Sequence, residues 1–514
     1  MTLRFRQVLL LAVLPLASCT VGPDYRRPAM PVPPAYTTAT TQPTTRPLTQ
    51  DWWQLFGDPA LTALEEEAIS RNYDLQAAMA RVEQARATAG VARAGFFPSA
   101  NFGPSFTRSA RGESGAAVVT GGGGTIINNG TATDGTGNAT GSTGGVVLSG
   151  GGGGTQYANS VSLPLDLSYE IDLWGRVRRQ YEAARARTQA SINDFGFVRL
   201  TLTADVATNY FNLRSLDAQD EIATRNIETY KRQLDFLEKQ GKAGFAAPLD
   251  VIQVRTLLSS TEATRFDLQR QRRLSQNAIA VLIGRPPSEL SLPSRPLTAM
   301  LPDVPAGLPA DLLRQRPDVA EAEATLVATN AQIGEAIAEF LPTLSLGASA
   351  GWRSDTVKGA FDFANRFFSV GPAVSVPIFD ASLGPNLNLA RAQYVEQLAA
   401  YRTTLLGAFR DVEDAMTNID LRARQSEAQE RAVADAREYV RLAEIQNRQG
   451  ILTPLQVLDA DRTLLQNELT AAQILNARMA STVLLIRAIG GGWSADLPPS
   501  FLPTTRPAVK ELSN

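Results

Sequence analysis

The residues best suited to chemistry are three acids in one short stretch, Asp166, Glu170 and Asp172. Two carboxyl groups at a fixed separation act as acid and base in glycoside hydrolysis, so such acids could belong to an enzyme site. The chain has no histidine, which excludes imidazole catalysis, histidine metal ligands and Ser-His-Asp triads. The same spacing places all three acids on one face of a strand lining a water-filled lumen, and we favour this interpretation.

The element that positions these acids is a strand with two different faces. From Val161 to Leu173 every odd residue is apolar and every even one is not. The run is longer than the 5 to 6 residues of an average soluble strand and suits the roughly 9 to 11 residues of a membrane-crossing strand. The alternative is a strand half buried in a soluble sheet. Similar alternation predicts four strands in all, at about 96–107, 160–173, 341–353 and 367–380. Their prolines, Pro104, Pro164, Pro372 and Pro377, are expected near strand ends, because proline removes a ladder donor.

The composition excludes several classes of partner. The 514 residues are 44% hydrophobic and 19% charged, with a net charge of −2, so no nucleic-acid partner is indicated. Beyond the N-terminus we find no apolar run of the ~18 residues that a spanning helix needs, so strands are expected to cross any membrane. Neither glycine run in the chain fits a nucleotide-binding loop.

The N-terminus has the pattern of a secretory signal that ends at the only cysteine. The junction Leu16-Ala17-Ser18-Cys19 resembles a bacterial lipobox, which predicts a signal peptide at 1–18 and lipidation (palmitate) of Cys19. Residues 19–57 are then a lipid-anchored segment, whose Pro/Thr-rich part, Gly22 to Gln50, is expected to be an extended tether rather than a packed element.

The rest of the chain contains two copies of one module. Helical patterns run from Pro59 to about Gly95, from Gly175 to about Gly241, and back to Ile283. A second set contains a long helix over about Asn386 to Thr453 and a return helix. The halves match at an offset of 244 before the strands and 206 after them, and the difference corresponds to a Gly-rich insert at 112–155 that we expect to be an extracellular loop. This organisation predicts repeats at 58–300 and 301–497, followed by a tail at 498–514.

The predicted fold is mixed α and β, with a duplicated helix-strand-strand-long helix-helix module. Four strands cannot close a membrane barrel, which needs about eight, and an open edge in lipid costs several kcal/mol per unpaired group. Three copies would give a 12-stranded barrel, with the long helices forming an α-helical tube.

Several motifs resemble the TolC-like outer-membrane factor family, and its NodT-type lipoproteins in particular. They are the stretches at 19–25, 52–59, 172–175, 283–284, 314–318 and 488–493. The resemblance implies a homotrimer in the outer membrane of a Gram-negative bacterium, with its α-helical barrel in the periplasm. The implied function is a passive exit duct for small molecules such as drugs. The implied partners are outer-membrane lipid, a periplasmic adaptor (membrane fusion) protein and an inner-membrane resistance-nodulation-division transporter; no enzyme activity, cofactor or metal is implied.

The resemblance also places the periplasmic aperture near the second-half turn. The family's two acids correspond to Gln456, which is not acidic, and Asp459. Asp461 and Arg448 are plausible local partners, while solvated surface charges are the alternative interpretation. The helical tips that contact the adaptor correspond to Gly244, Ala247, Pro248 and Leu249 in the first half and to Gly450, Pro454 and Leu455 in the second.

Two other functions remain open. The duct of a type I protein secretion system would have the same fold. A coiled-coil scaffold lipoprotein would explain Cys19 and the helical repeats but would leave the four alternating runs without a role.

Overall fold

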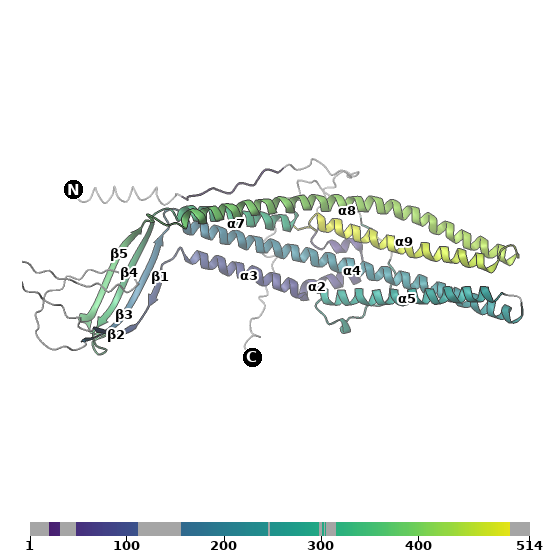
Figure 1. Ribbon diagram of the computed structural model, residues 1–514, viewed down its shortest axis with the longest axis horizontal. Coiled ribbons are helices and arrows are strands. Elements are labelled where there is room, and N and C mark those ends of the chain that lie inside the picture. Colours follow the sequence, from purple (N-terminus) through teal and green to yellow (C-terminus); the bar gives the residue numbers. More distant parts are fainter. Residues whose placement is uncertain are drawn as a thin grey trace, which may run out of the picture. The chain divides into compact units, whose positions relative to one another are not determined.

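The structure is a computed structural model that describes residues 20–30, 48–111, 156–244, 247–297, 301–302, 304 and 315–493. The signal peptide, Cys19, the Gly-rich insert at 112–155 and the tail at 498–514 lie outside the described residues. The chain divides into two compact units (Figure 1). The sheet unit comprises Ala94–Leu173 and Leu341–Ile378, and the helical unit holds the remaining described residues.

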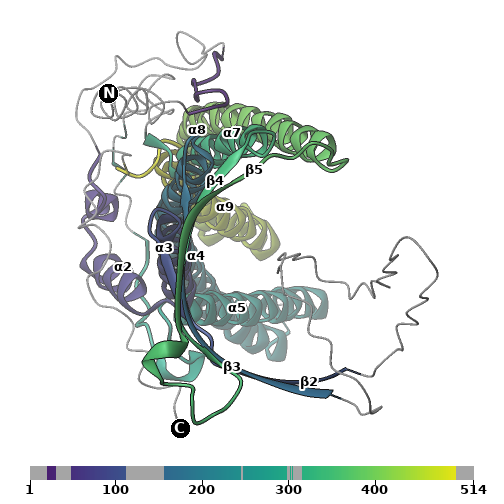
Figure 2. The same ribbon diagram turned by 90° about the vertical axis from the view of Figure 1, so that its left-hand side faces the viewer.

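The sheet unit is one curved antiparallel sheet (Figure 2). Its order is β1-β3-β4-β5, with β2 pairing on β3 next to β1. The bounds are β1 Ser99–Phe102, β2 Ser105–Arg111, β3 Gln156–Ile171, β4 Thr343–Ser354 and β5 Arg366–Ser375. All four predicted strands are present, but the first is interrupted at Gly103 and Pro104. Both β1 and β2 keep the same register on β3, so the interruption causes no slip.

The prolines only partly follow the expectation that they lie near strand ends. Pro104 is in the break and Pro377 follows β5, whereas Pro164 and Pro372 lie inside β3 and β5. For these two the expectation is wrong. The Pro164 carbonyl accepts a hydrogen bond from Gly103 N at 3.2 Å, but proline has no N–H to return one, so the missing ladder bond falls at the break between β1 and β2. Pro372 is tolerated because β5 is an edge strand of the chain's sheet.

The helical unit contains two long antiparallel pairs and shorter helices beside them (Figure 1). The pairs are α4 Arg176–Lys242 with α5 Pro248–Leu282, and α8 Leu383–Arg448 with α9 Pro454–Ala488. The shorter helices are α2 Pro59–Arg71, α3 Tyr73–Ala94 and α7 Pro317–Ala338, and the 3₁₀ turns are η2 Trp52–Phe56 and η3 Pro287–Glu289, with η5 Phe363–Asn365 in the sheet unit.

One helix boundary differs from the sequence prediction. The helix expected from Pro59 to about Gly95 is two helices, because Asn72 between them is extended. The Asn72 side chain accepts a hydrogen bond from Leu75 N and donates one to Leu282 O, each at 2.9 Å. Asn72 therefore caps the start of α3 while it ties α2 to α5.

The duplication is confirmed by the lengths and starting positions of equivalent helices. Helices α5 and α9 each have 35 residues and start 206 residues apart, at Pro248 and Pro454. Helices α3 and α7 each have 22 residues and start 244 residues apart, at Tyr73 and Pro317. The two halves therefore repeat the same structural module.

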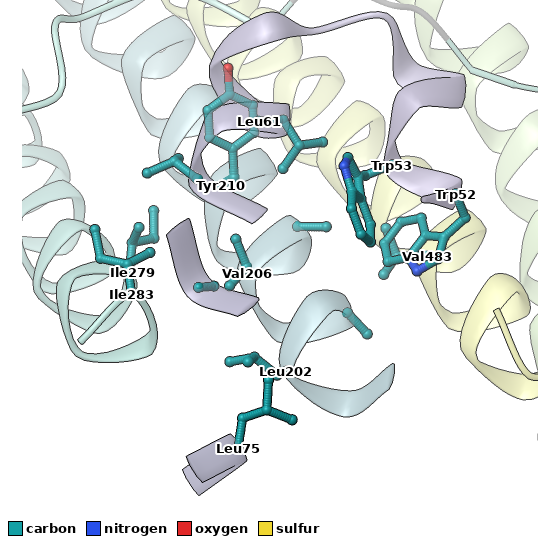
Figure 3. Close-up of a cluster of buried hydrophobic side chains, with 14 of the residues drawn as sticks. Trp52, Trp53, Leu61, Leu75, Leu202, Val206, Tyr210, Ile279, Ile283 and Val483 are labelled. Atoms are coloured by element: carbon teal, nitrogen blue, oxygen red, sulfur yellow. The ribbon is translucent and has the colours of Figure 1, made fainter. Parts of the chain in front are cut away.

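Several hydrophobic clusters hold the helices together. The largest one packs η2, α2 and α3 against the middle of α4 and the ends of α5 and α9 (Figure 3). There Trp52 and Trp53 are 1% and 2% exposed, and Tyr210 of α4 is fully buried. A second cluster lies nearer the tips, where Ile227, Tyr230 and Leu237 of α4 pack on α5 and α9. These three residues follow one another at steps of three and seven, which is the spacing of the core positions of a coiled coil.

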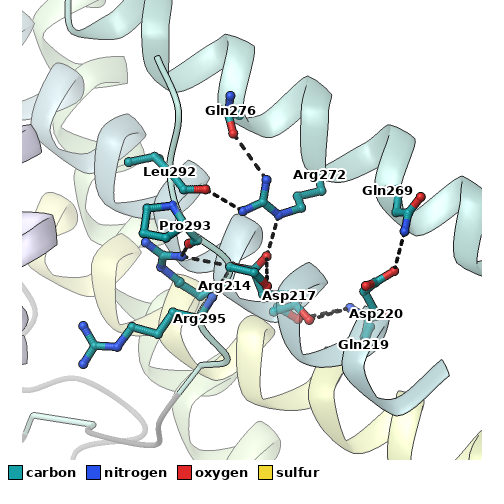
Figure 4. A network of polar contacts seen from close by, with 12 residues as sticks. Arg214, Asp217, Gln219, Asp220, Gln269, Arg272, Gln276, Leu292, Pro293 and Arg295 are labelled. Carbon is teal, nitrogen blue, oxygen red and sulfur yellow. Dashed lines mark hydrogen bonds and ion pairs between the residues drawn. The ribbon is translucent and has the colours of Figure 1, made fainter. Parts of the chain in front are cut away.

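A buried ion network fastens the segment after α5 to α4 and α5 (Figure 4). Asp217 is fully buried and accepts hydrogen bonds from Arg214, Arg272, Ser294 Oγ and Arg295 N at 2.5 to 3.1 Å. Arg214 and Arg272 also donate to the carbonyls of Pro293 and Leu292. The several partners of each charge offset much of the cost of burial, although Arg214 Nε is buried without a hydrogen-bond partner.

Residues 20–30 do not behave as the tether expected from their composition. They have no regular secondary structure but are fastened to α4 and α7. Arg179, 4% exposed, donates to Val21 O and Gly22 O at 3.2 and 3.3 Å and pairs with Asp24 at 2.9 Å. Arg27 donates two hydrogen bonds to Glu323 of α7. The prediction is therefore wrong for this part of the segment, because specific polar contacts outweigh its lack of apolar residues.

Helix α9 corrects a second expectation. Among the described residues, α9 is the one helix that is long and apolar enough to cross a membrane, judged by length and composition alone. Core helices pass the same test, and α9 contributes buried residues to the clusters that contain α4 and α8. Packing within the helical unit thus accounts for the buried part of its apolar side.

Candidate functional site

Two of the three acids singled out in the sequence, Asp166 and Glu170, lie on the polar face of the sheet. Asp166 is opposite Ser349 of β4 and Asn101 of β1, and Glu170 is opposite Ser345. Asp172 lies one residue beyond the end of β3. The neighbours of the two strand acids are small and polar, which suits a surface in contact with water.

The spacing along β3 argues against one of the possible acid pairs, Asp166 with Glu170. Residues four apart on a strand are about 13 Å apart at 3.3 Å per residue. The two carboxyl groups of a glycosidase lie at most about 9.5 Å apart, so Asp166 and Glu170 cannot form such a pair. The remaining acid, Asp172, follows the strand rather than facing Asp166 across the sheet.

The opposite face of the sheet is apolar and open. The register aligns Leu165 of β3 with Phe102 of β1 and Ala350 of β4, and Ala350 with Phe368 of β5. The exposed fractions are 52% for Leu165, 62% for Phe102 and 83% for Phe368. Large apolar side chains this exposed on one continuous face mark a surface that meets lipid or another protein. The predicted two-faced strand is therefore part of a two-faced sheet.

The tip of the first helix pair is built for a tight turn. Gly244 has φ +78°, which a glycine adopts without strain, and a Cβ there would meet nothing within 4 Å. Ala247 is extended and Pro248 opens α5 at its first turn, where proline costs no hydrogen bond. Leu249 is 65% exposed. The turn explains the glycine and the proline, and Leu249 is left as an exposed apolar side chain.

The tip of the second pair repeats this geometry. Gly450 has φ +74° and Pro454 opens α9. Thr453 and Gln456 form a capping box, with Gln456 Oε1 accepting from Thr453 N at 3.0 Å. Leu455 is 44% exposed. The Gln456 side chain, at the position of an expected aperture acid, thus stabilises the start of the helix.

The four residues predicted for the aperture have different environments. Asp459 is exposed, whereas Asp461 is buried, 8% exposed, and accepts a hydrogen bond from Gln233 of α4 at 2.9 Å. Burial raises the pKa of the Asp461 carboxyl, Gln233 opposes the shift and the charge of Glu444 adds to it. Arg448 pairs with Glu444 at 3.6 Å. Within this chain, then, neither Asp461 nor Arg448 is placed as a partner of Asp459.

A charge cluster that sequence reasoning missed links three helices. Glu468 of α9 is 7% exposed and binds Arg225 of α4 at 2.7 Å and Arg437 of α8 at 2.9 Å. The cluster borders a cavity of about 370 Å³ between these helices. Nothing in the sequence distinguishes Glu468 from the many surface acids, because its partners are 31 and 243 residues away.

The described residues hold no group of three or more Asp, Glu, Cys or His side chains with the geometry for a metal ion. The structure thus contains a sheet with one polar and one apolar face. The chain consists of two modules, and each module contains strands followed by a long helix. This defines the class as a channel subunit whose strands meet the membrane.

Comparison with known proteins identifies the family. Residues 64–285 and 308–491 match the model of the Outer membrane efflux protein family, and the chain belongs to it. It is 32% identical over 507 residues to the solvent efflux pump outer membrane protein SrpC of Pseudomonas putida, covering 96% of this chain and 99% of that one. It is 33% identical over 451 residues to the pyoverdine export outer membrane protein OpmQ of Pseudomonas aeruginosa, covering 87% and 88%.

A solved structure agrees with this assignment. The outer-membrane channel OprN superposes with a TM-score of 0.80 at 30% identity, covering 92% of this chain and 100% of that one. The outer-membrane location, the mixed α and β fold and the exit-duct function expected from the sequence are thereby confirmed, and the family is one of channels.

Proposed function

We propose that three copies of this chain assemble into a passive duct through which an efflux pump exports small molecules. The observation that carries this proposal is the two-faced sheet, whose edges, β1 with β2 on one side and β5 on the other, have no partner strand among the described residues. An open edge in lipid is costly, so pooling the strands of three copies closes the barrel. The polar face with Asp166 and Glu170 then lines the lumen.

The helical pairs of the three copies form the periplasmic part of the duct. Asp459 is exposed near the tip of α9, so three copies around one axis make an acidic ring that attracts cations. Leu249 and Leu455, exposed at the two tips, offer apolar contacts to a periplasmic adaptor. The adaptor connects the duct to an inner-membrane resistance-nodulation-division transporter, which supplies the energy. No catalytic step belongs to this chain.

Lipidation of Cys19 anchors the mature chain to the membrane. The residue lies outside the described residues, but the segment immediately after it is fastened to the helical unit through Arg179. Acyl chains on Cys19 therefore hold the folded helical unit near the membrane.

Two alternatives predict different behaviour. A type I protein secretion duct would have the same fold, but SrpC and OpmQ are named for solvent efflux and pyoverdine export, which favours small molecules. A coiled-coil scaffold leaves the exposed apolar face of the sheet without a role.

Conductance in planar bilayers tests the duct directly, with the mass of the detergent-solubilised oligomer measured on the same sample. A trimer with a small cation-selective conductance supports the proposal. Asp459→Ala should raise the conductance or reduce its selectivity. The control Asp435→Ala, which replaces an exposed acid of α8, should leave the conductance and the selectivity unchanged. A monomer that never conducts, and that needs no detergent once Cys19 is replaced, would favour the scaffold.

A further inference from the structure

The apolar face of the sheet carries arginines at only one end of its strands. Arg366 of β5 lies opposite Trp352 of β4, which in turn lies opposite Leu163 of β3, so all three share the apolar face. Arg108 of β2 lies opposite Asn159, two residues from Val161 on the same face of β3. At the other end of this face the paired positions are apolar: Tyr169, Ile171, Leu344, Leu346, Pro372 and Val374.

Each of these arginines rests on an exposed aromatic ring. The Arg366 guanidinium carbon is 3.5 Å from the centroid of the Phe363 ring, and that of Arg108 is 4.7 Å from the Tyr157 ring. Phe363 and Tyr157 are 75% and 62% exposed. Cation–π contacts thus orient both guanidinium groups, and among the described residues no carboxylate is paired with either of them.

The position of the arginines along the strands matches one boundary of a bilayer. The apolar rows extend from Ile171 to Val161, ten residues or about 33 Å along the strand. At the usual tilt of a membrane strand this corresponds to an apolar band of about 25 Å. Arg366 lies within the last rows of this band and Arg108 just beyond it. The opposite end, at Ile171, is where β3 leads toward α4.

We propose that Arg108 and Arg366 bind the phosphate groups of the phosphorylated glycolipid in the outer leaflet of the outer membrane. The exposed apolar rows below them bind acyl chains, the rings orient the guanidinium groups, and the two uncompensated cations recognise the anionic headgroup. This inference rests on the proposed function, because that function places the arginine end of the strands at the outer surface.

The sheet topology makes the site a junction between copies. Arg108 is on β2 and Arg366 on β5, at opposite edges of the chain's sheet. When three copies pool their strands, the β5 edge of one copy meets the β1 and β2 edge of the next. The two arginines of one site then come from neighbouring copies, which gives three equivalent sites per trimer.

The test uses the full lipidated protein, with bound lipid measured by native mass spectrometry. The probe is the purified phosphorylated glycolipid, compared with the same lipid after its phosphates have been removed. The wild type should retain up to three phosphorylated lipids per trimer and bind the dephosphorylated lipid weakly. The double variant Arg108→Gln/Arg366→Gln should lose about 30-fold in affinity, about fivefold for each cation near the membrane surface.

A matched control exists on the other face of the same sheet. Arg353 lies opposite Ser162 on the polar face, and its guanidinium is 5.1 Å from the Phe367 ring. Arg353→Gln should keep wild-type lipid binding, and Arg108→Lys/Arg366→Lys should restore most of it. Millimolar inorganic phosphate should not compete, because it lacks the acyl chains.

Several results would overturn the proposal. They are equal binding of both lipids, unchanged binding in the double glutamine variant, an equal loss in Arg353→Gln, or complete competition by phosphate. The double variant is first checked for trimer mass and conductance. Loss of both the trimer and the conductance would indicate misfolding. Lipid binding by Arg108→Lys/Arg366→Lys then decides whether the positive charges are required. A wild type that binds the lipid but does not conduct would refute the duct while leaving the lipid site standing.

Discussion

Gln233 of α4 donates a hydrogen bond to the Asp461 carboxylate of α9 over 2.9 Å, just two residues after Asp459. The contact separates two acids that look equivalent in the sequence. Asp461 is buried and holds α9 against α4, whereas Asp459 is exposed and available to line the aperture.

Asp461→Asn should leave conductance unchanged, in contrast to Asp459→Ala, because asparagine keeps an acceptor for Gln233. The raised pKa of Asp461 means that the folded state holds its proton to a higher pH than the unfolded state does. Wild-type stability therefore falls as pH rises from about 4, the ordinary aspartate pKa, through the raised value. Thermal unfolding in detergent should show this fall in the wild type and a smaller one in Asp461→Asn. An altered conductance in Asp461→Asn would place this residue in the aperture.

Glu321 of α7 should produce a second pH dependence. Burial, together with the charges of Asp194 and Asp318, raises its pKa to about 7, and Arg81 opposes the shift. Because the folded pKa exceeds the ordinary value, the contribution to stability is fully present below about pH 4.5 and is lost as pH rises to about 7. Glu321→Gln should remove this part of the slope, measured as thermal unfolding across that range. Glu396→Gln, at an exposed position of α8, should not change the slope.

Glu468→Gln should destabilise the helical unit by about 1.5 to 3 kcal/mol, because it weakens charged hydrogen bonds from Arg225 and Arg437 on two other helices. Chemical unfolding in detergent measures the difference. Glu444→Gln disrupts the exposed pair with Arg448 and should cost about 0.5 kcal/mol or less. Equal losses of unfolding free energy in the two variants would show that the burial of Glu468 does not strengthen its ion pairs.

Gly22→Ala should release the N-terminal segment from the helical unit. Gly22 has φ +95°, and a Cβ there would lie 2.4 Å from the Gly334 Cα, so alanine meets both backbone strain and a clash. We expect a cost of about 1 to 3 kcal/mol and faster proteolysis of residues 20–30. Gly90→Ala is the control, since a Cβ at that position in α3 meets nothing within 4 Å and alanine favours the helix. Protection of residues 20–30 in Gly22→Ala equal to the wild type would refute the role of this close approach.

Arg179→Ala tests the same attachment from the side of α4. The change removes the donors to Val21 O and Gly22 O and leaves Asp24 without its partner. Residues 20–30 should become sensitive to protease while the thermal unfolding of the remaining helices changes less than in Glu468→Gln. Arg178→Ala, at the neighbouring position, provides a comparison that leaves these three contacts in place. Protease sensitivity that is the same in both variants would contradict a specific role for Arg179.

Features with a regular repeat were predictable from the sequence alone. Alternation along β3 predicted a strand with one polar and one apolar face, and the matching turns at Gly244 and Gly450 predicted the duplicated helix pairs. Such patterns are local, since a strand repeats every two residues and a helix every 3.6, and each repeat determines which side chains share a face. The family resemblance followed from short motifs at the ends of these elements.

Other features depend on contacts between residues far apart in the chain, and only the tertiary structure decided them. Asn72 divides a helix because its side chain reaches Leu282, and Pro164 is accepted inside β3 because its backbone faces the break between β1 and β2. Asp459 and Asp461 look alike in the sequence, yet packing against α4 buries only the second. Periodicity determined which face each residue occupies, whereas burial, partners and charge depended on which other element that face meets.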